Sequence, residues 1–307
     1  MSSLTTCANP EYPPLRGYLY AALVVAMWTG FILVSRAGGI SSLSAWDIIA
    51  IRYAIAAAIL LPCWWFGQRV ALLNGRLALL AATGGLGYAV LAFGGFKLAP
   101  AAHAAILLPG LLPFAVALSA RTLLGEVPSV GRVVGLLVVA SGTACLVMDG
   151  FNGSIAVLYG DLLMIGASVC WACYTVLIRR WGISPWEATV SVVMLTAFVY
   201  LPIYLIALPK HLASAPWSDI ATQAVYQGVI ATVIQMLLYV RTIALIGPTR
   251  LGLLMALVPG LAGIAAVPLL DEALSPWELT ALALVCLGAW QGNRRTSTEP
   301  RRKPCLT

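Results

Sequence analysis

The sequence predicts an all-α integral membrane protein whose ten transmembrane helices form two inverted five-helix repeats. Three observations lead to this fold class: a very hydrophobic composition, apolar runs of membrane-spanning length, and an internal repeat that covers nearly the whole chain. Of the 307 residues, 61% are hydrophobic and only 9% are charged, whereas a soluble domain carries roughly 25% charged residues. Because too few charges are present to cover a soluble fold, hydrocarbon must surround most of the surface.

Charged and turn-forming residues separate the apolar runs. A helix needs about 20 apolar residues to cross a bilayer, so ten crossings use about 200 residues and leave only short loops. The fourth run is separated from the fifth by Gly125-Glu126-Val127-Pro128, and the ninth from the tenth by Asp271-Glu272 with Ser275-Pro276. We expect helices at 17–36, 45–65, 76–97, 101–121, 130–149, 159–180, 186–208, 221–245, 248–270 and 276–292.

The lysine and arginine residues predict the orientation. If the N-terminus is cytoplasmic, the inner side holds 14 of the 18 basic residues, namely Arg16, Arg69, Arg76, Arg121, Arg132, Arg179, Arg180, Arg241, Arg250, Arg294, Arg295, Arg301, Arg302 and Lys303. The outer side then holds Arg36, Arg52, Lys97 and Lys210. Since cytoplasmic loops are rich in basic residues, we expect a multi-pass inner-membrane protein with both termini in the cytoplasm and a basic cytoplasmic tail over 294–307.

The two halves of the chain resemble each other. In the first part of each half, Gly17, Trp28, Arg36 and Gly39-Ile40-Ser41 recur 143 residues later at Gly160, Trp171, Arg179 and Gly182-Ile183-Ser184. In the second part, Pro113, Leu123-Leu124, Glu126 and Gly142 recur 146 residues later at Pro259, Leu269-Leu270, Glu272 and Gly288. We expect repeats over 14–149 and 157–293.

Each repeat holds five helices, and because five is odd, the second copy enters the membrane from the opposite side. Inverted repeats are common in secondary transporters, where a substrate site lies between the two copies. An ancient duplication without any transport role is the alternative. The sequence has no G-x-x-x-x-G-K-[ST] phosphate loop, so we expect no built-in ATPase.

The repeated residues also resemble a known family. Met27-Trp28-Thr29-Gly30 and Cys170-Trp171-Ala172-Cys173 lie in the first helix of each half, and Arg52-Tyr53-Ala54 lies in the second helix. Pro113 precedes Leu123-Leu124-Gly125-Glu126 as Pro259 precedes Leu269-Leu270-Asp271-Glu272. From about 14 to 293 the chain resembles the EamA-type members of the drug/metabolite transporter superfamily. The resemblance implies ten helices, both termini inside, and movement of small metabolites, with many members exporting amino acids or related compounds.

Aromatic, polar and helix-breaking residues within the predicted spans are the candidates for substrate binding. They are Trp28, Tyr88, His103, Pro113, Trp171, Tyr174, Gln227, Gln235, Tyr239, Arg250 and Pro259. The tryptophans lie nearer mid-helix than the membrane interface, which favours an aromatic wall over interface anchoring. Prolines interrupt the fourth and ninth helices at equivalent places, and broken helices line the substrate site in many transporters.

Three cationic side chains each have two interpretations. Arg52 either reaches the outer headgroups or pairs with a buried carbonyl or an anionic substrate. His103 and Arg250, near the start of the fourth helix of each half, either anchor the interface or hold a carboxylate at opposite ends of the path. The central parts of the helices lack Asp and Glu, which argues against the usual carboxylate relay for protons, although His103 or Asp161 remains a candidate for proton coupling.

These observations predict a permease that exports small metabolites, such as amino acids or related compounds, by alternating access between the repeats. Proton-coupled efflux of drugs or toxic compounds is the alternative. A membrane enzyme would need clustered catalytic residues, but the chain has only two histidines, His103 and His211, and no zinc or triad pattern. A receptor or scaffold does not account for the inverted repeat, and no segment resembles a channel filter. The expected partners are a small-molecule substrate and lipid, with no nucleic acid, cofactor or metal, and a monomer suffices.

Overall fold

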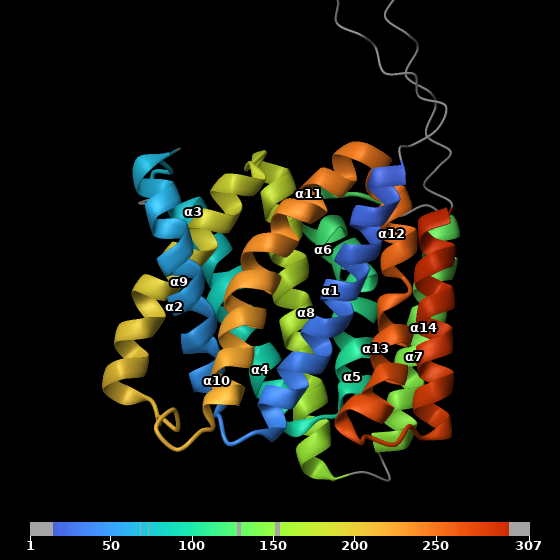
Figure 1. Cartoon of the computed structure of the whole chain (residues 1–307). Helices are drawn as coiled ribbons and strands as arrows, with labels where there is room; N and C mark the ends of the chain where they lie inside the picture. The colour runs from blue at the N-terminus through green and yellow to red at the C-terminus, as the bar shows by residue number, and fades with distance from the viewer. Residues whose placement is uncertain (1–14, 68, 73, 128–129, 151–153, 295–307) are drawn as a thin grey trace, which may run out of the picture.

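The computed structural model describes residues 15–67, 69–72, 74–127, 130–150 and 154–294, and the regular structure in those residues is helical. The helices form ten rods that stand side by side in one bundle (Figure 1). The predicted basic tail, 294–307, lies outside the described residues except for Arg294, which ends the last helix. The predicted all-helical fold of two five-helix repeats is therefore confirmed for the described part of the chain.

The first repeat contains five rods, of which the third and fourth are composite. The first two are α1 (Leu15–Ile40) and α2 (Ala45–Phe66). The third joins α3 (Gly75–Leu80), a π-helical segment (Ala81–Gly87) and α4 (Tyr88–Leu98). The fourth joins α5 (Ala101–Ala105), a π-helical segment (Ile106–Gly110) and α6 (Leu112–Leu124), and the fifth is α7 (Val130–Gly150).

The second repeat has the same order of rods. The first two are α8 (Ile155–Trp181) and α9 (Pro185–Ala207). The third joins α10 (Trp217–Gln223), a π-helical segment (Ala224–Ile234) and α11 (Gln235–Ile246). The fourth joins α12 (Pro248–Met255) and α13 (Val258–Leu270), and the fifth is α14 (Pro276–Arg294).

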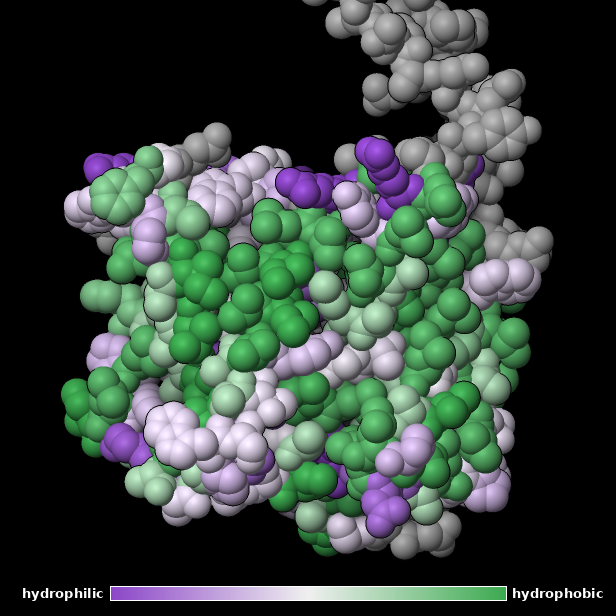
Figure 2. Space-filling view, in the orientation of Figure 1, coloured by the Kyte–Doolittle hydropathy of each residue, from purple (hydrophilic) through white to green (hydrophobic). Residues whose placement is uncertain are grey.

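Length and hydropathy mark most of these rods as membrane spans. Eight of the helices in the described residues are long and apolar enough to cross a bilayer, and α7 contains a shorter apolar stretch, Val133–Leu146. The remaining rod, α14, packs along α7. Hydrophobic residues cover most of the middle of the visible face, whereas hydrophilic residues gather at its upper and lower edges (Figure 2). This pattern is expected for a bundle whose middle part is surrounded by the hydrocarbon core of a bilayer.

The two ends of the bundle differ in the basic residues that they carry. We call the end at which α1 begins and α14 ends the terminus side, which is uppermost in Figure 1, and the other end the far side. The described arginines that the sequence places on the cytoplasmic side lie in elements or loops at the terminus side; they are Arg16, Arg69, Arg76, Arg121, Arg179, Arg180, Arg241 and Arg250. The even number of rods explains why the chain enters and leaves the bundle at the same end.

Prolines break the fourth rod of each repeat at equivalent positions, as predicted. The fourth rod of the first repeat breaks at Leu111, and Pro113 stands in the first turn of α6. The fourth rod of the second repeat breaks at Leu257, and Pro259 stands in the first turn of α13. Proline is favoured there because its missing N–H is not needed in the first turn of a helix.

The repeats pack reciprocally. The third rod of the first repeat lies against α8 and α9, and the third rod of the second repeat lies against α1 and α2. The fifth rods, α7 and α14, pack on each other through small residues. A Cβ atom built on Gly135 would lie 2.7 Å from the carbonyl oxygen of Gly288. The repeats are therefore held together by reciprocal contacts of the third rods and by the packing of the equivalent helices α7 and α14.

We expect the Gly135→Ala substitution to destabilise the bundle, because the new methyl group meets backbone atoms of α14 that cannot turn away. Overpacking of this kind costs about 1–3 kcal/mol. Thermal unfolding of the purified protein in detergent measures the effect. Gly75→Ala is the matched control, since a Cβ atom at Gly75 meets nothing within 4 Å, and equal losses for the two variants would contradict the packing described for α7 and α14.

Candidate functional site

Aromatic side chains from both repeats meet in the middle of the bundle. The rings of Trp28 on α1 and Trp171 on α8 lie edge to face, with centroids 6.5 Å apart. The Trp171 ring also lies 4.8 Å from that of Tyr88 and 5.1 Å from that of Tyr174. The sequence predicted an aromatic wall of Trp28, Trp171 and Tyr174 and selected Tyr88 separately, and the structure brings the four side chains together at the boundary between the repeats. We call them the central aromatic group.

Arg52 points into the bundle beside this group. Its Nη1 donates a hydrogen bond to Oε1 of Gln227 at 2.9 Å, and Nε2 of Gln227 donates to the Ser35 hydroxyl at 2.9 Å. The guanidinium carbon lies 5.6 Å from the centroid of the Phe31 ring and 6.0 Å from that of Tyr53. The headgroup interpretation of Arg52 is therefore wrong, because the side chain extends across to a glutamine of the other repeat.

Several buried polar atoms nearby have no protein partner. Within the described part of the chain, Nε1 of Trp28, Oγ1 of Thr29 and Oε1 of Gln235 are buried and accept or donate no hydrogen bond. Gln235 stands two turns after Gln227 in the same rod. Because buried polar groups are nearly always hydrogen-bonded, unpaired atoms on α1 and α11 mark a place where a polar ligand or water would satisfy them.

The third rods are π-helical where they pass this region. Gln227 lies in the π-helical segment Ala224–Ile234, and Tyr88 directly follows the segment Ala81–Gly87. Segments of this kind are frequent at functional sites. Gly84 in the segment Ala81–Gly87 also has a packing role, since a Cβ atom there would clash with the Tyr174 ring.

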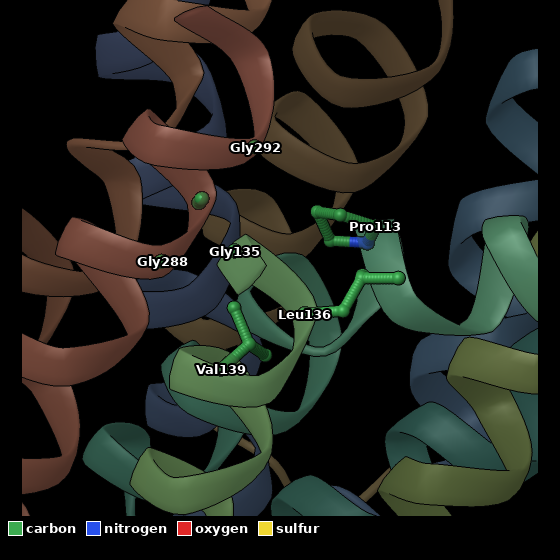
Figure 3. Close-up of a pocket in the computed structure, with 7 residues that line it drawn as sticks. Pro113, Gly135, Leu136, Val139, Gly288 and Gly292 are labelled. Atoms are coloured by element: carbon green, nitrogen blue, oxygen red, sulfur yellow. The ribbon is translucent and has the colours of Figure 1, made fainter. Parts of the chain in front are cut away.

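Besides Gln227, Gln235 and His103, four further candidates lie outside the central aromatic group. Pro113 lines a small pocket between α6, α7 and α14 (Figure 3), and Pro259 is buried at the start of α13. Tyr239 is 37% exposed on α11, and Arg250 is exposed at the terminus side. The two prolines shape the broken helices, and the structure describes no contact between these four residues and the central aromatic group.

Equivalent ion pairs join the repeats at the two ends of the bundle. At the far side, Nε of Arg36 lies 2.5 Å from Oε1 of Glu272. At the terminus side, Nη2 of Arg179 lies 2.7 Å from Oε1 of Glu126. Arg36 and Arg179 correspond in the sequence repeat, as do Glu126 and Glu272, so each repeat supplies the arginine at one end and the glutamate at the other.

The two ion pairs differ in burial and in additional contacts. The far-side side chains are 14% and 16% exposed, whereas the terminus-side side chains are 54% and 49% exposed. Arg36 also donates to the carbonyl oxygen of Phe96 at 2.8 Å, and Glu272 accepts from the backbone N–H of Ala101 at 2.7 Å. The far side is therefore closed more tightly than the terminus side in this structure.

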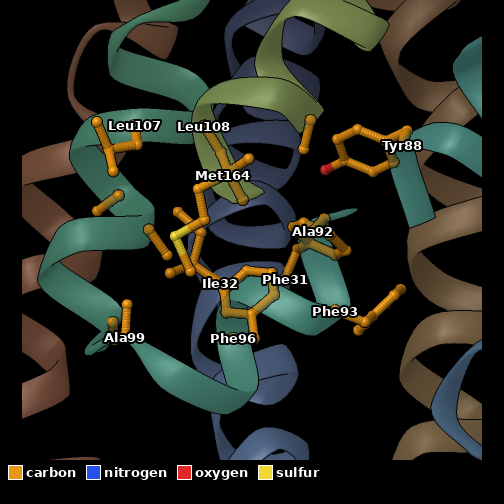
Figure 4. Close-up of a cluster of buried hydrophobic side chains, with 14 of the residues drawn as sticks. Phe31, Ile32, Tyr88, Ala92, Phe93, Phe96, Ala99, Leu107, Leu108 and Met164 are labelled. Atoms are coloured by element: carbon orange, nitrogen blue, oxygen red, sulfur yellow. The ribbon is translucent and has the colours of Figure 1, made fainter. Parts of the chain in front are cut away.

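A hydrophobic core lies between the central aromatic group and the far-side ion pair. The Phe31 ring lies 6.0 Å from the Phe96 ring and 6.4 Å from the Phe93 ring, measured between centroids. Figure 4 shows these rings together with Met164 of α8 and Leu107 of the fourth rod. Because Phe31 contacts Arg52 and Phe96 contacts Arg36, this core separates the central group from the far side.

His103 lies at the far side between two carboxylates. Its Nδ1 is 2.8 Å from Oδ1 of Asp161 on α8, and its Nε2 is 3.3 Å from Oε1 of Glu278 on α14. The three side chains are 3%, 12% and 6% exposed. With both ring nitrogens occupied by carboxylates of the protein, His103 lies apart from the central group in a cluster of its own.

Sequence reasoning did not select Glu278, Tyr53 or Ser35. A signal for Glu278 was present, because Ser275-Pro276-Trp277-Glu278 has the spacing of a capping box. The backbone N–H of Ser275 donates to Oε2 of Glu278 at 2.7 Å, and the backbone N–H of Glu278 donates to the Ser275 hydroxyl at 3.1 Å. Such a box fixes a helix start, but it does not reveal that the carboxylate also faces a histidine 175 residues away.

Comparison with known proteins relates these features to transport. The model of the EamA-like transporter family matches residues 15–148 and again residues 158–291. A protein described as the uncharacterized transporter YyaM of Bacillus subtilis (strain 168) is 27% identical over 237 residues, which cover 71% of this chain and 73% of that protein.

A second relative is described as the threonine/homoserine exporter RhtA of Escherichia coli (strain K12). It is 32% identical over 133 residues, which cover 42% of this chain and 43% of the exporter, so this match spans less than half of either protein. A solved crystal structure that is described only as that of a protein matches this chain with a TM-score of 0.61 and 20% sequence identity. The match covers 92% of this chain and 99% of the chain in that structure. At that identity the likeness concerns the fold alone.

We expect loss of the two equivalent glutamates to have unequal effects on stability. Glu272→Gln leaves the largely buried Arg36 without its counter-charge, which costs about 3–5 kcal/mol. Glu126→Gln breaks an exposed pair, which costs at most about 1 kcal/mol. The measurement is thermal or denaturant unfolding of both variants in the same detergent, and a larger loss for Glu126→Gln would overturn the assignment of the tighter end.

Proposed function

The chain belongs to the EamA-like transporter family, and we propose that it is a secondary transporter that exports small carboxylate-bearing metabolites, such as amino acids or related compounds. The observation that carries this proposal is the inward-facing Arg52, which lies between the repeats beside the central aromatic group. Transport proceeds by alternating access, in which the far side and the terminus side open in turn.

Arg52 supports a carboxylate substrate. Among the residues that the structure describes, no carboxylate lies within ion-pair distance of its guanidinium, which donates instead to the neutral amide of Gln227. A charge inside a membrane protein is costly unless it is paired. The planar guanidinium fork matches a carboxylate with two parallel hydrogen bonds, so a substrate carboxylate would supply the missing counter-charge.

The aromatic side chains support the remainder of the substrate. The faces of Trp28, Trp171 and Tyr88 provide apolar contact and bind an ammonium group through cation–π attraction. The unpaired Nε1 of Trp28 and Oε1 of Gln235 offer one donor and one acceptor. A zwitterionic amino acid presents a carboxylate, an ammonium and a side chain that fit these three features. The name of the relative RhtA, an amino-acid exporter, agrees with this class.

The two ion pairs support alternating access. Arg36 with Glu272 holds the repeats together at the far side, and Arg179 with Glu126 holds them at the terminus side. An opening at one end must separate one pair while the other stays closed. Because the terminus-side pair is the more exposed one, we expect it to open first, and an exporter would load its substrate from there.

The charge distribution supports the orientation within the cell. We assign the terminus side, with most of the basic residues, to the cytoplasm, and the far side to the exterior of the inner membrane. The repeats span 14–149 and 157–293, and 294–307 forms a basic cytoplasmic tail. Since the central group is built from residues of one chain, a monomer suffices for transport.

We expect cells that produce the protein to tolerate higher concentrations of at least one toxic amino-acid analogue than cells that lack it. The same analogue with its carboxylate converted to a carboxamide should show no such difference, because the amide offers no counter-charge to Arg52. Growth over a concentration series is the measurement. Equal tolerance of every analogue in both strains would refute export, and equal export of acid and amide would refute carboxylate recognition.

We expect Arg52→Gln to lower substrate flux in proteoliposomes by at least about tenfold, since hydrogen bonds to a charged group contribute about 1.5–3 kcal/mol. Arg52→Lys should give an intermediate flux, because it keeps the charge but loses the fork. Arg76→Gln is the matched control, as Arg76 is exposed at the terminus side. Full flux in Arg52→Gln would contradict its role in the substrate site.

A further inference from the structure

The far-side cluster of His103, Asp161 and Glu278 has an unusual proton balance. Each ring nitrogen of His103 faces a carboxylate oxygen, at 2.8 Å and 3.3 Å. A neutral imidazole has one N–H and one lone pair, so with two ionised carboxylates a lone pair would face a negatively charged oxygen. The geometry therefore requires at least one further proton, either on the imidazole or on a carboxyl group.

With that proton in place, the cluster still carries one net negative charge. Two carboxylates around an imidazolium sum to minus one, and a neutral imidazole between a carboxylic acid and a carboxylate gives the same sum. The three side chains are at most 12% exposed. The backbone N–H of Ser275, which donates to Oε2 of Glu278 at 2.7 Å, supplies a hydrogen bond but no positive charge, and a buried charge without a counter-charge is unfavourable. One more proton, carried on a carboxylate oxygen of Asp161 or Glu278, makes the closed cluster neutral.

Neighbouring charged groups do not neutralise the net negative charge of the cluster. The elements packed against α5 include α1, α4, α8, α13 and α14. On them, Arg36 is paired with Glu272, which also accepts from the N–H of Ala101. Lys97 donates to the carbonyl oxygens of Ser41 and Leu43, and Asp271 is exposed at the end of α13. In the described residues the remaining groups that face His103 are the two carboxylates themselves.

The cluster spans the boundary between the repeats and occurs at one end only. His103 belongs to the first repeat, whereas Asp161 and Glu278 belong to the second. By the offsets of the repeat, Tyr18 corresponds to Asp161 and Arg132 to Glu278, and the position that corresponds to His103 is Thr249, next to Arg250. The terminus side thus has no counterpart of this arrangement in the sequence, in contrast to the ion pairs, which both ends share.

We propose that His103, Asp161 and Glu278 form a proton-binding site whose occupancy closes the far side of the transporter. This inference rests on the proposed alternating access. When the far side is closed, the cluster is buried and takes up one proton from the adjoining solution. When the repeats separate there, water solvates Asp161 and Glu278, and one of them returns the proton to that same solution. An acidic exterior therefore favours the closed far side.

Linkage fixes the sign and the size of the effect. Because closing takes up one proton, the ratio of closed to open molecules falls by about tenfold for each unit by which the pH rises, over the range in which that proton is exchanged. In Asp161→Asn or Glu278→Gln, one carboxylate remains beside an imidazolium and the buried pair is already neutral. Those variants have no further proton to take up, so the ratio should no longer depend on pH.

The experiment measures the far-side distance directly. Spin labels at Ile40→Cys on α1 and Leu279→Cys on α14, both exposed, are placed in full-length protein lacking its other cysteines and reconstituted in vesicles. Electron-electron double resonance then gives the populations of closed and open molecules against pH. We expect the pH slope in the parent and its loss in Asp161→Asn and in Glu278→Gln. Asp219→Asn, at the far side on α10, is the control that keeps the slope.

Infrared difference spectra of the unlabelled protein between acidic and neutral pH provide a second measurement, which does not depend on transport. We expect the signal of a protonated carboxyl group, absent in Asp161→Asn or in Glu278→Gln. If the infrared spectra show a titrating carboxyl group but the spin labels give one distance at every pH, alternating access is refuted and the proton site is retained. Two distances with an unchanged slope in both variants, or no titrating carboxyl group in the parent, would overturn the proton site.

Discussion

A charge placed in hydrocarbon must find a partner, and in the described bundle the buried charges of the first repeat find theirs in the second. Arg36 meets Glu272, and His103 lies between Asp161 and Glu278. Asp47 accepts a hydrogen bond from the Tyr204 hydroxyl at 2.5 Å, and Arg52 donates to Gln227. Lipid tails drive helices together only weakly, so these polar contacts, with close packing through small residues, determine how the two repeats fit against each other.

The same constraint bears on the alternating access that we propose. In that mechanism, contacts between the repeats break at one end for a solute to pass, while contacts at the other end hold. The inverted repeat supplies equivalent arginine–glutamate pairs at the two ends, but the two pairs differ in burial. The far-side pair has additional backbone partners and an aromatic core beneath it, whereas the terminus-side pair is about half exposed.

Between the two ends, the centre combines features that rarely occur in a core built only for stability. One arginine has a neutral amide partner, two tryptophans from equivalent helices meet edge to face, and buried polar atoms have no partner in the described residues. The adjoining third rods carry π-helical segments, which displace side chains from regular helical positions. These features together favour a ligand site, and the repeat explains why both halves contribute to it.

The crossings, their inverted order and the breaks at Pro113 and Pro259 could be predicted from the amino-acid sequence alone. Hydrocarbon acts on each apolar segment separately, and proline acts on its own turn of helix, so local composition is sufficient for these features. The tertiary structure was needed to show that Arg52 faces Gln227 rather than the headgroups, and that the partners of His103 are the carboxylates of Asp161 and Glu278. Those contacts join residues 58 to 175 positions apart, and they depend on how helices rotate and pack against one another, which the spacing of residues along one helix does not specify.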